Sequence, residues 1–433
     1  MIRSEILTRS YPDGEVQRVQ LVRWDDWSKL RFLRSEGEQG ALATYAQLYR
    51  RYLIPACPWI FGQMLLFMLP QPGNREQLLS AVDTLRRGVK LRGGKPVFVT
   101  EKARALWEEL AYAGCFEIAA GRLPVTRVLP VDRSGFLLSR CEPEARLRVN
   151  ASFFIFDPFD CATRYDAIGT PFGLMIEDGE ILSPPLYGRE ALLVYRDGHV
   201  SVETPALEKL CVRIGEKSFC PGHDGTLFTR PFRRKTPPGT GWDHVIVGRK
   251  LIDVVRGGCC NIPASGFVLR LREKAGEAGD DVWYEGMERV LFAIQAGNSL
   301  VRGGRETTGF ISTFYNVYRP WNTPYPPSLY PLDYEKARAS RIALGADAEG
   351  KPMLLWAEGA AKIGHQPGDD SCGASLSEFA AICRDAGMVD GVNLDGGGSS
   401  QILVNNERSL QLSDRDDNGT EQEREIPLGL VVR

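Results

Sequence analysis

The sequence predicts an α+β fold of strand-rich mixed sheets with flanking helices, plus a helical N-terminal insertion or subdomain. Three observations support this fold class. Residues 1–40 alternate apolar and polar side chains around a turn, and residues 41–140 contain amphipathic patterns of helical period. Residues 141–433 form a series of short apolar runs separated by glycine-containing turns. We therefore expect strands of the main domain in 1–40, a helical subdomain in 41–140 and the rest of the main domain in 141–433.

Size and charge limit the class of protein. The chain has 433 residues, enough for one elaborated domain or two, and its formal net charge of −2 gives no electrostatic basis for binding nucleic acid. The most apolar stretch, residues 54–70, is short and interrupted by prolines, so we expect a buried element and no transmembrane segment. The N-terminus lacks the apolar region of a signal peptide, which makes a cytoplasmic location the default expectation. Ten cysteines without a Cys-x-x-Cys pair are expected to be mostly free thiols, with a few disulfides if the protein is exported.

The first elements follow from local patterns. In "EVQRVQLVRW" (15–24) apolar and polar residues alternate after an Asp-Gly turn, which predicts a strand. Helices are expected at 74–89, where Asn74 is a suitable N-cap, and at 100–114, where Thr100 takes that position. Further on, four runs with Asp-Gly or Gly-Arg turns predict strands and hairpins. They are 146–156, 172–182, 191–202 and 244–255.

The last quarter of the chain has the clearest pattern. Residues 340–359 are predicted to form a strand, a turn and a second strand. "SLSEFAAICRDAG" (375–387) is predicted to be a helix, because Ser375 and Glu378 have the spacing of a capping box and Gly387 suits the C-terminal stop. A strand at 388–395 then leads into three consecutive glycines.

This glycine turn, "LDGGGSSQ" (394–401), is the strongest candidate for a functional site. Glycines permit positive φ and bring a ligand close to bare backbone, and successive N–H groups in such a turn bind anions, phosphate above all. The hydroxyls of Ser399 and Ser400 add donors. Strand alternation directs Val392 and Leu394 to one face, so that Asp395 lies on the other face, beside the turn. A β-bulge or a tight corner would also use glycines.

"NLDGGGSS" (393–400) resembles the signature of the phosphodiester glycosidase family. Further segments resemble that family in the same order along residues 145–433. They are "VNASFF" with Asn150, "SRIALGAD" with Arg341, "GASLSE" with Glu378 and "EREIPLGLVV" with Arg424. Three positions depart from the family pattern: Ser340 replaces a proline, Ala151 replaces a glycine, and Glu358 stands in a segment that lacks the usual arginine. Relatives often carry a secretion signal, which we do not see here.

The resemblance implies a glycoside hydrolase that cleaves the anomeric C–O bond of a sugar-1-phosphodiester, either a glycan phosphodiester or a nucleotide sugar. Glycoside cleavage commonly uses two carboxyl groups, and we expect Asp395 and Glu378 to be these catalytic groups. The residues expected to bind substrate or phosphate are Asn150, Arg341, Gly396, Gly397, Gly398, Ser399 and Ser400. Two alternatives are a non-catalytic binder of phosphorylated glycans and a phosphodiesterase that cleaves P–O bonds. The oligomeric state is not predicted.

A separate pattern suggests a divalent cation, Ca²⁺ or Mg²⁺. "DRDDNGTEQERE" (414–425) has the residue spacing of a calcium loop. Its flanks are predicted to be strands and not the two helices of an EF-hand, so a solvated acidic hairpin is the alternative. The candidate metal ligands are Asp414, Asp416, Asn418 and Glu425.

Overall fold

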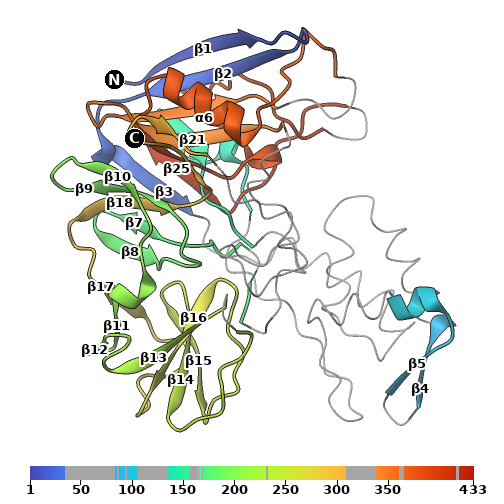
Figure 1. Cartoon of the computed structure of the whole chain (residues 1–433), viewed down its shortest axis with the longest axis vertical. Helices are drawn as coiled ribbons and strands as arrows, with labels where there is room; N and C mark the ends of the chain where they lie inside the picture. The colour runs from blue at the N-terminus through green and yellow to red at the C-terminus, as the bar shows by residue number, and fades with distance from the viewer. Residues whose placement is uncertain are drawn as a thin grey trace. The chain divides into compact units, whose positions relative to one another are not determined.

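The computed structural model (Figure 1) describes part of the chain. The described residues are 1–34, 83–84, 87–92, 95–105, 135–155, 163, 165–167, 169–230, 233–308, 338–359, 365–415 and 419–433. The chain divides into two compact units, which are described separately below. The first contains 1–35, 135–154 and 171–433, and the second contains 36–134 and 155–170. In the described ranges, no helix combines the length and apolar character needed to cross a membrane.

The first unit contains a seven-stranded sheet in which the N-terminal hairpin joins strands from the last quarter of the chain (Figure 1). Its neighbours along the sheet pair antiparallel. The predicted strands at 15–24 and 340–359 are confirmed, and both belong to this sheet. The strand order is β1 (Arg3–Ser10), β2 (Val16–Arg23), β22 (Pro352–Ala357), β21 (Arg341–Ala346), β23 (Asp390–Asn393), β19 (Ser299–Arg302) and β20 (Arg305–Glu306).

Both faces of this sheet are covered, which explains its continuous apolar strands. On β22, Leu354 and Trp356 belong to one hydrophobic cluster, shared with the other sheets. Leu355 and Met353, on the opposite face of the same strand, pack with helix α6 (Leu376–Asp385) in a second cluster. All six residues of β22 are buried as a result. In Figure 1, α6 is the orange helix labelled beside β1 and β2, above β21.

Helix α6 begins and ends as its sequence predicts. The Ser375 side chain accepts a hydrogen bond from the Glu378 N–H (3.2 Å), and the Glu378 carboxylate accepts one from the Ser375 N–H (2.9 Å). This is the capping box, which satisfies two N–H groups that the helix itself cannot pair. At the other end Gly387 adopts φ +92°, a conformation that glycine reaches without steric cost.

Two further antiparallel sheets complete the apolar core beneath the seven-stranded sheet. Their hairpins confirm the predicted turns: Asp178 and Gly179, both with positive φ, connect β7 (Met175–Glu177) to β8 (Glu180–Ser183). The four-stranded sheet contains β24 (Ile402–Val404), β6 (Leu147–Asn150), β25 (Leu428–Val432) and β3 (Leu30–Arg34). The five-stranded sheet contains β10 (Val200–Glu203), β9 (Ala191–Tyr195), β18 (Val290–Gln295), β7 (Met175–Glu177) and β8 (Glu180–Ser183).

Residues 211–285 add two small antiparallel sheets, which share a separate hydrophobic cluster with the five-stranded sheet. A disulfide joins Cys211 and Cys220 here, whereas the five other described cysteines are free, as expected for most of them. One small sheet contains β12 (Lys217–Phe219), β11 (Cys211–Ile214) and β17 (Val282–Glu285). The other contains β13 (Gly225–Thr229), β16 (Gly266–Leu271), β14 (Trp242–Val247) and β15 (Lys250–Arg256). Single-turn 3-10 helices occur at η1 (Trp27–Lys29), η3 (Leu138–Arg140), η5 (Leu207–Lys209) and η7 (Gly397–Ser399).

The second unit is described only in part. It contains the hairpin β4 (Val89–Arg92) and β5 (Lys95–Phe98), followed by a short helical segment at 101–105. The Thr100 hydroxyl accepts a hydrogen bond from the Ala103 N–H (3.2 Å), so the predicted N-cap is confirmed. The helical region predicted at 41–140 lies mostly outside the described residues. The described part of that range includes a strand hairpin that was not predicted.

The capping box leads to a stability prediction. Ser375→Ala removes the acceptor for the Glu378 N–H and is expected to lower the free energy of unfolding by about 1 kcal/mol. Ser377→Ala is the matched control, since Ser377 is exposed in the first turn of the same helix. Urea unfolding of both variants measures the difference. An equal loss in the two variants would contradict a specific capping role.

Candidate functional site

Asp395 follows β23, an inner strand next to β21, where the chain leaves the seven-stranded sheet. Val392 and Leu394 are fully buried in the same hydrophobic cluster, as the alternation predicts. The Asp395 N–H donates to the Ala151 carbonyl (3.0 Å), and the Leu394 N–H donates to the Ile342 carbonyl (2.8 Å). These bonds fix the backbone on both sides of Asp395, whose residue is partly exposed. A carboxylate fixed in this way at a strand end can approach a ligand without a large change in the backbone.

Asn150 holds the two ends of the glycine turn together. Its side-chain Nδ2 donates to the Asp395 carbonyl (2.7 Å), and its Oδ1 accepts from the Gln401 N–H (3.1 Å). Asn150 is 1 % exposed, so these hydrogen bonds are protected from water. The sequence predicted that Asn150 binds substrate. That role stays a prediction; the structure brings both ends of the Asn150 amide to the turn, so this residue also positions the site.

The three glycines differ in what surrounds them. Gly397 has φ +60° and open space around its Cα, so it is needed for its backbone conformation. A methyl group on Gly396 would lie 2.9 Å from the Ser340 carbonyl oxygen, and one on Gly398 would lie 2.3 Å from Arg424 Nη2. The Gly397 N–H donates to the Ser340 carbonyl (2.8 Å). Among the described residues, the N–H groups of Gly396 and Gly398 have no acceptor, so two backbone donors remain for a ligand.

Two arginines border the turn, and one of them, Arg424, is paired with the Asp414 carboxylate. Arg341 opens β21, is 5 % exposed and donates from Nε to the Ala374 carbonyl (3.2 Å). Its Cδ would lie 3.9 Å from a methyl group on Gly396. Arg424 lies at the other end of the triplet, beside Gly398. Arg341 and two backbone N–H groups form an environment that favours an anion, whereas the charge of Arg424 is balanced by Asp414.

The two serines after the glycines are also buried. Ser399 is 2 % exposed and Ser400 is 1 % exposed. The Ser400 hydroxyl oxygen is buried and finds no hydrogen-bond partner within the part of the chain that the structure describes. Because an unpaired buried hydroxyl costs free energy, this group is available to a water molecule or a ligand.

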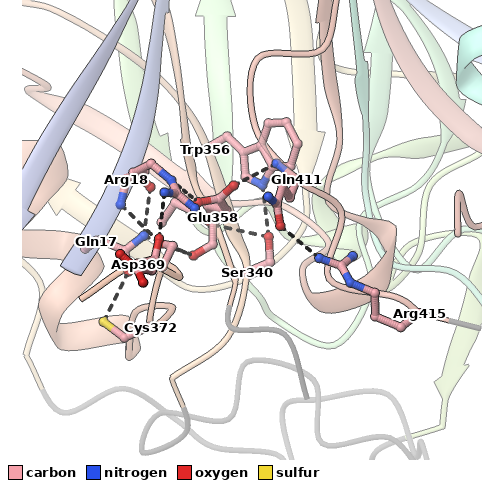
Figure 2. A network of polar contacts seen from close by, with 11 residues as sticks. Gln17, Arg18, Ser340, Trp356, Glu358, Asp369, Cys372, Gln411 and Arg415 are labelled. Carbon is pink, nitrogen blue, oxygen red and sulfur yellow. Dashed lines mark hydrogen bonds and ion pairs between the residues drawn. The ribbon is translucent and has the colours of Figure 1, made fainter. Parts of the chain in front are cut away.

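Ser340 connects the turn to a buried polar network (Figure 2). Its hydroxyl accepts from Trp356 Nε1 (2.9 Å) and donates to the Ala357 carbonyl (3.2 Å), while its backbone carbonyl accepts from Gly397. The serine that departs from the family pattern therefore packs β22 and the glycine turn against each other. A proline at this position would lack the hydroxyl that pairs with Trp356.

Glu358, which also departs from the family pattern, is the charged centre of the same network (Figure 2). It is 2 % exposed and accepts from Arg18 Nε (2.5 Å) and from the Gln411 N–H (2.7 Å). Arg18 comes from β2, so the N-terminal hairpin supplies the counter-ion. Both carboxylate oxygens of Glu358 are thus hydrogen-bonded, which a buried carboxylate requires.

Glu378, predicted as the second catalytic carboxyl, is bound by Arg338. Arg338 donates from Nε and Nη2 to the carboxylate, at distances of 2.7–3.1 Å. Burial acts to raise the pKa of Glu378, but the hydrogen bonds from Arg338 and Ser375 outweigh it, so that its pKa lies below the usual range. Glu378 is therefore ionised at neutral pH. The arginine also stacks on the Tyr11 ring, 4.6 Å from its centroid.

The candidate calcium loop contains an ion pair in its described part. Arg424 donates from Nε to Asp414 Oδ2 (2.8 Å) and from Nη2 to Oδ1 (3.1 Å). Glu425 is exposed, and Asp416 and Asn418 lie outside the described residues. Within the described ranges, no three His, Cys, Asp or Glu side chains are grouped to hold a metal ion. The metal site stays a prediction, and Asp414 has an arginine as its observed partner.

Sequence reasoning missed Arg338 and the Asp414–Arg424 pair. Arg338 pairs with Glu378, which is distant along the chain, and Arg424 pairs with Asp414 inside the candidate metal loop. Neither pair has a local sequence pattern. Arg338 stands three residues before Arg341, which was the only available signal.

Comparison with known proteins agrees with the resemblance seen in the sequence. Residues 268–433, which include the glycine turn, match the model of the phosphodiester glycosidase family. No curated protein matches the chain. Several solved structures are similar to it at low identity, among them three whose alignments each cover all of this chain.

The first is a hypothetical protein from Synechocystis (13 % identity, TM-score 0.46), of whose chain 62 % is covered. The second is the zebrafish N-acetylglucosamine-1-phosphodiester alpha-N-acetylglucosaminidase catalytic domain, auto-inhibited by its pro-peptide (11 % identity, TM-score 0.42, 82 % of that chain). The third is a protein from Burkholderia pseudomallei K96243 (14 % identity, TM-score 0.40, 96 % of that chain). The chain thus spans less than two thirds of the Synechocystis structure.

The contacts of the glycines predict different tolerance to substitution. Gly398→Ala places a methyl group 2.3 Å from Arg424 Nη2 and from both Asp414 carboxylate oxygens, and is expected to cost about 1–3 kcal/mol of stability. Gly397→Asn is the matched control, because asparagine tolerates positive φ and its Cβ meets open space. Urea unfolding compares the variants. Equal stability of Gly398→Ala and wild type would show that the ion pair does not press on the turn.

The lowered pKa of Glu378 predicts a pH-dependent contribution to stability. The Arg338 bond contributes fully above the ordinary carboxyl pKa of about 4.3, and its contribution is lost as the pH falls through the lowered value. Glu378→Gln keeps a capping-box residue but removes the charge. It is expected to lose about 1 kcal/mol at neutral pH, a value reduced for partial exposure, and almost nothing in strong acid.

The control for this measurement is Glu349→Gln. Glu349 pairs with Lys351, but its side chain is 71 % exposed, so its loss is expected to change stability little at any pH. Urea unfolding across the pH range measures both. A difference between Glu378→Gln and wild type that stays constant with pH would count against the ion pair as its source.

Proposed function

We propose that this protein is a glycoside hydrolase that cleaves the anomeric C–O bond of a sugar-1-phosphodiester, with Asp395 as a catalytic carboxylate. The observation that carries the proposal is the position of Asp395 next to a turn that offers two backbone donors and is bordered by two arginines. The match of residues 268–433 to the phosphodiester glycosidase family supports the same reaction. A carboxylate beside an anion site suits a substrate in which a sugar and a phosphate share one bond.

In this proposal the phosphate binds at the glycine turn. The N–H groups of Gly396 and Gly398 and the hydroxyls of Ser399 and Ser400 donate to its oxygens, and Arg341 supplies positive charge. Arg424 lies at the same turn, beside Gly398, with its charge balanced by Asp414. The charge that develops on the phosphate as the C–O bond breaks would be stabilised by donors that are already in place.

Asp395 acts on the sugar side of the bond. Glycoside cleavage proceeds through an oxocarbenium-like transition state, which a carboxylate stabilises as a nucleophile, as a base or by its charge. A phosphate leaving group needs less protonation than an alcohol. We therefore assign stabilisation of the leaving group to the phosphate site and not to a second acid.

Glu378 has a narrower role in this scheme. Its pKa lies below the usual range, since the hydrogen bonds from Arg338 and Ser375 outweigh the effect of burial. An ionised carboxylate can accept a proton from water but cannot donate one to a leaving group. If Glu378 is the second catalytic carboxyl, we propose that it acts as a base; its other role is to hold Arg338 at the start of β21.

A divalent cation at 414–425 belongs to the proposal as a separate question. A Ca²⁺ or Mg²⁺ ion bound by Asp414, Asp416, Asn418 and Glu425 would displace Arg424 from Asp414. Since that arginine adjoins Gly398, the metal and the glycine turn would be linked through it. Hydrolysis measured with and without EDTA tests this link.

Replacement of Asp395 gives the central prediction. Asp395→Asn is expected to reduce the hydrolysis of sugar-1-phosphodiesters and nucleotide sugars by at least about 100-fold, because it removes the charge that the transition state requires. Asp385→Asn is the matched control: it makes the same chemical change on the exposed end of α6 and is expected to keep wild-type activity. Release of free sugar from a panel of both substrate classes measures the rate.

The same assay in ¹⁸O-labelled water separates the alternatives. Label in the sugar is the expected result, whereas label in the phosphate would identify a phosphodiesterase. Binding of a phosphorylated glycan without turnover, unchanged by Asp395→Asn, would identify a non-catalytic binder. An active, folded Asp395→Asn variant would overturn the assignment of this carboxylate.

A further inference from the structure

A pocket of about 820 Å³ lies between the β11–β12 hairpin and the segment that follows β16, outside the site described above. The β11–β12 hairpin and the following turn form one wall, and residues 271–276 form another. Ile214 and Leu271, each 3 % exposed, contribute apolar surface to it, and Phe219 adds an aromatic ring. Neither the glycine turn nor the two arginines beside it line this pocket. Its volume is that of a small-ligand site.

The first wall is held in one conformation by several independent bonds. The disulfide between Cys211 and Cys220 closes the hairpin at its open end. Asp224 then accepts from the Cys220 N–H (2.8 Å) and contacts His223 Nδ1 (2.7 Å). These two hydrogen bonds, first that of Cys220 and then that of His223, lower the pKa of Asp224. His223 is thereby oriented at the rim with its Nε2 directed away from its partner.

The second wall is also fixed by the fold. The Ala275 N–H donates to His244 Nε2 (3.0 Å), and His244 Nδ1 contacts the Leu269 carbonyl (3.2 Å). Burial lowers the pKa of His244, which keeps the ring neutral and able to accept through Nε2. Gly276 packs closely against the hairpin, since a methyl group there would lie 2.7 Å from Ile214 Cγ2. Both walls are therefore formed before any ligand arrives, which lowers the entropic cost of binding.

The rim carries donors and acceptors in equal number. Within the described part of the chain, the Lys217 and Arg272 side chains have no ion-pair or hydrogen-bond partner, and the same holds for Glu216 and Glu273. With Lys274 and Asp224 included, the lining holds three cations and three carboxylates, which give no net attraction for a phosphate. A neutral sugar needs a different arrangement: hydroxyls that both donate and accept at its edge, and an apolar face that packs on carbon.

From this geometry we propose that the pocket is a second carbohydrate site, which binds a neutral oligosaccharide without cleaving it. Sugar hydroxyls donate to Glu216, to Glu273 and to His223 Nε2, and they accept from Lys217 and Arg272. The apolar face of a sugar ring rests on Phe219. This inference does not depend on Asp395 or on the proposed hydrolysis.

Titration calorimetry with the full chain tests the site. The probes are neutral tetrasaccharides of glucose, mannose and N-acetylglucosamine, together with mannose 6-phosphate and an uncharged peptide of similar size. At least one neutral tetrasaccharide is expected to bind at millimolar concentration or below. Glu273→Gln and Lys217→Ala are each expected to weaken that binding about fivefold or more, the loss of one hydrogen bond to a charged group.

Matched controls come from the same region of the chain. Glu208→Gln and Lys209→Ala make the same changes at exposed positions outside the pocket and are expected to leave the affinity unchanged. Asp395→Asn is expected to bind the neutral sugar like wild type, so failure of the proposed hydrolysis and failure of this site give different results. Three outcomes overturn the inference: no neutral tetrasaccharide binds, binding ignores the pocket variants, or mannose 6-phosphate or the peptide binds more tightly and that binding is weakened by the pocket variants.

Discussion

The two hydrogen bonds of the Asn150 side chain are the constraint on which the candidate site depends. A run of three glycines has no side chains with which to fix its own path, so its shape must come from its neighbours. Asn150 provides this by donating to the Asp395 carbonyl before the glycines and accepting from the Gln401 N–H after them. Because β6 and β23 belong to different sheets, this one side chain also sets the relation between the sheet that carries Asp395 and the sheet that follows the turn.

Once its ends are fixed, neighbouring groups can pack against the turn at distances that only glycine allows. The Ser340 carbonyl approaches Gly396, and the Asp414–Arg424 pair approaches Gly398. Only Gly397 is required for its positive φ. One of the three glycines is therefore needed for its backbone conformation and two for close packing. Together they place two N–H groups that have no acceptor among the described residues beside the Asp395 carboxylate.

Local sequence patterns predicted many of the strands, turns and helix ends of this fold. They did not predict contacts between residues that are distant along the chain. The capping box of α6 and the Asp178–Gly179 turn rest on neighbours in sequence, so they could be identified from spacing alone. The glycine turn could be identified for the same reason. The bond between Arg338 and Glu378 spans 40 positions and has no pattern of its own, so Glu378 was predicted to be a catalytic group and is observed in an ion pair. Asp414 was likewise predicted to be a metal ligand from the spacing of a calcium loop. Its observed partner, Arg424, lies within the same loop sequence.

The buried pair of Arg18 and Glu358 shows why the N-terminal hairpin belongs to this argument. A carboxylate that is 2 % exposed is costly unless a cation and hydrogen bonds compensate it, and removal of one partner from such a pair costs about 3–5 kcal/mol. Arg18 is contributed by β2, some 340 positions earlier in the chain. Glu358 directly follows β22, whose Trp356 and Ala357 hold the Ser340 hydroxyl, and Ser340 holds Gly397. The first hairpin of the chain thus stabilises the end of β22 against which the glycine turn is placed, so the site requires both ends of the sequence.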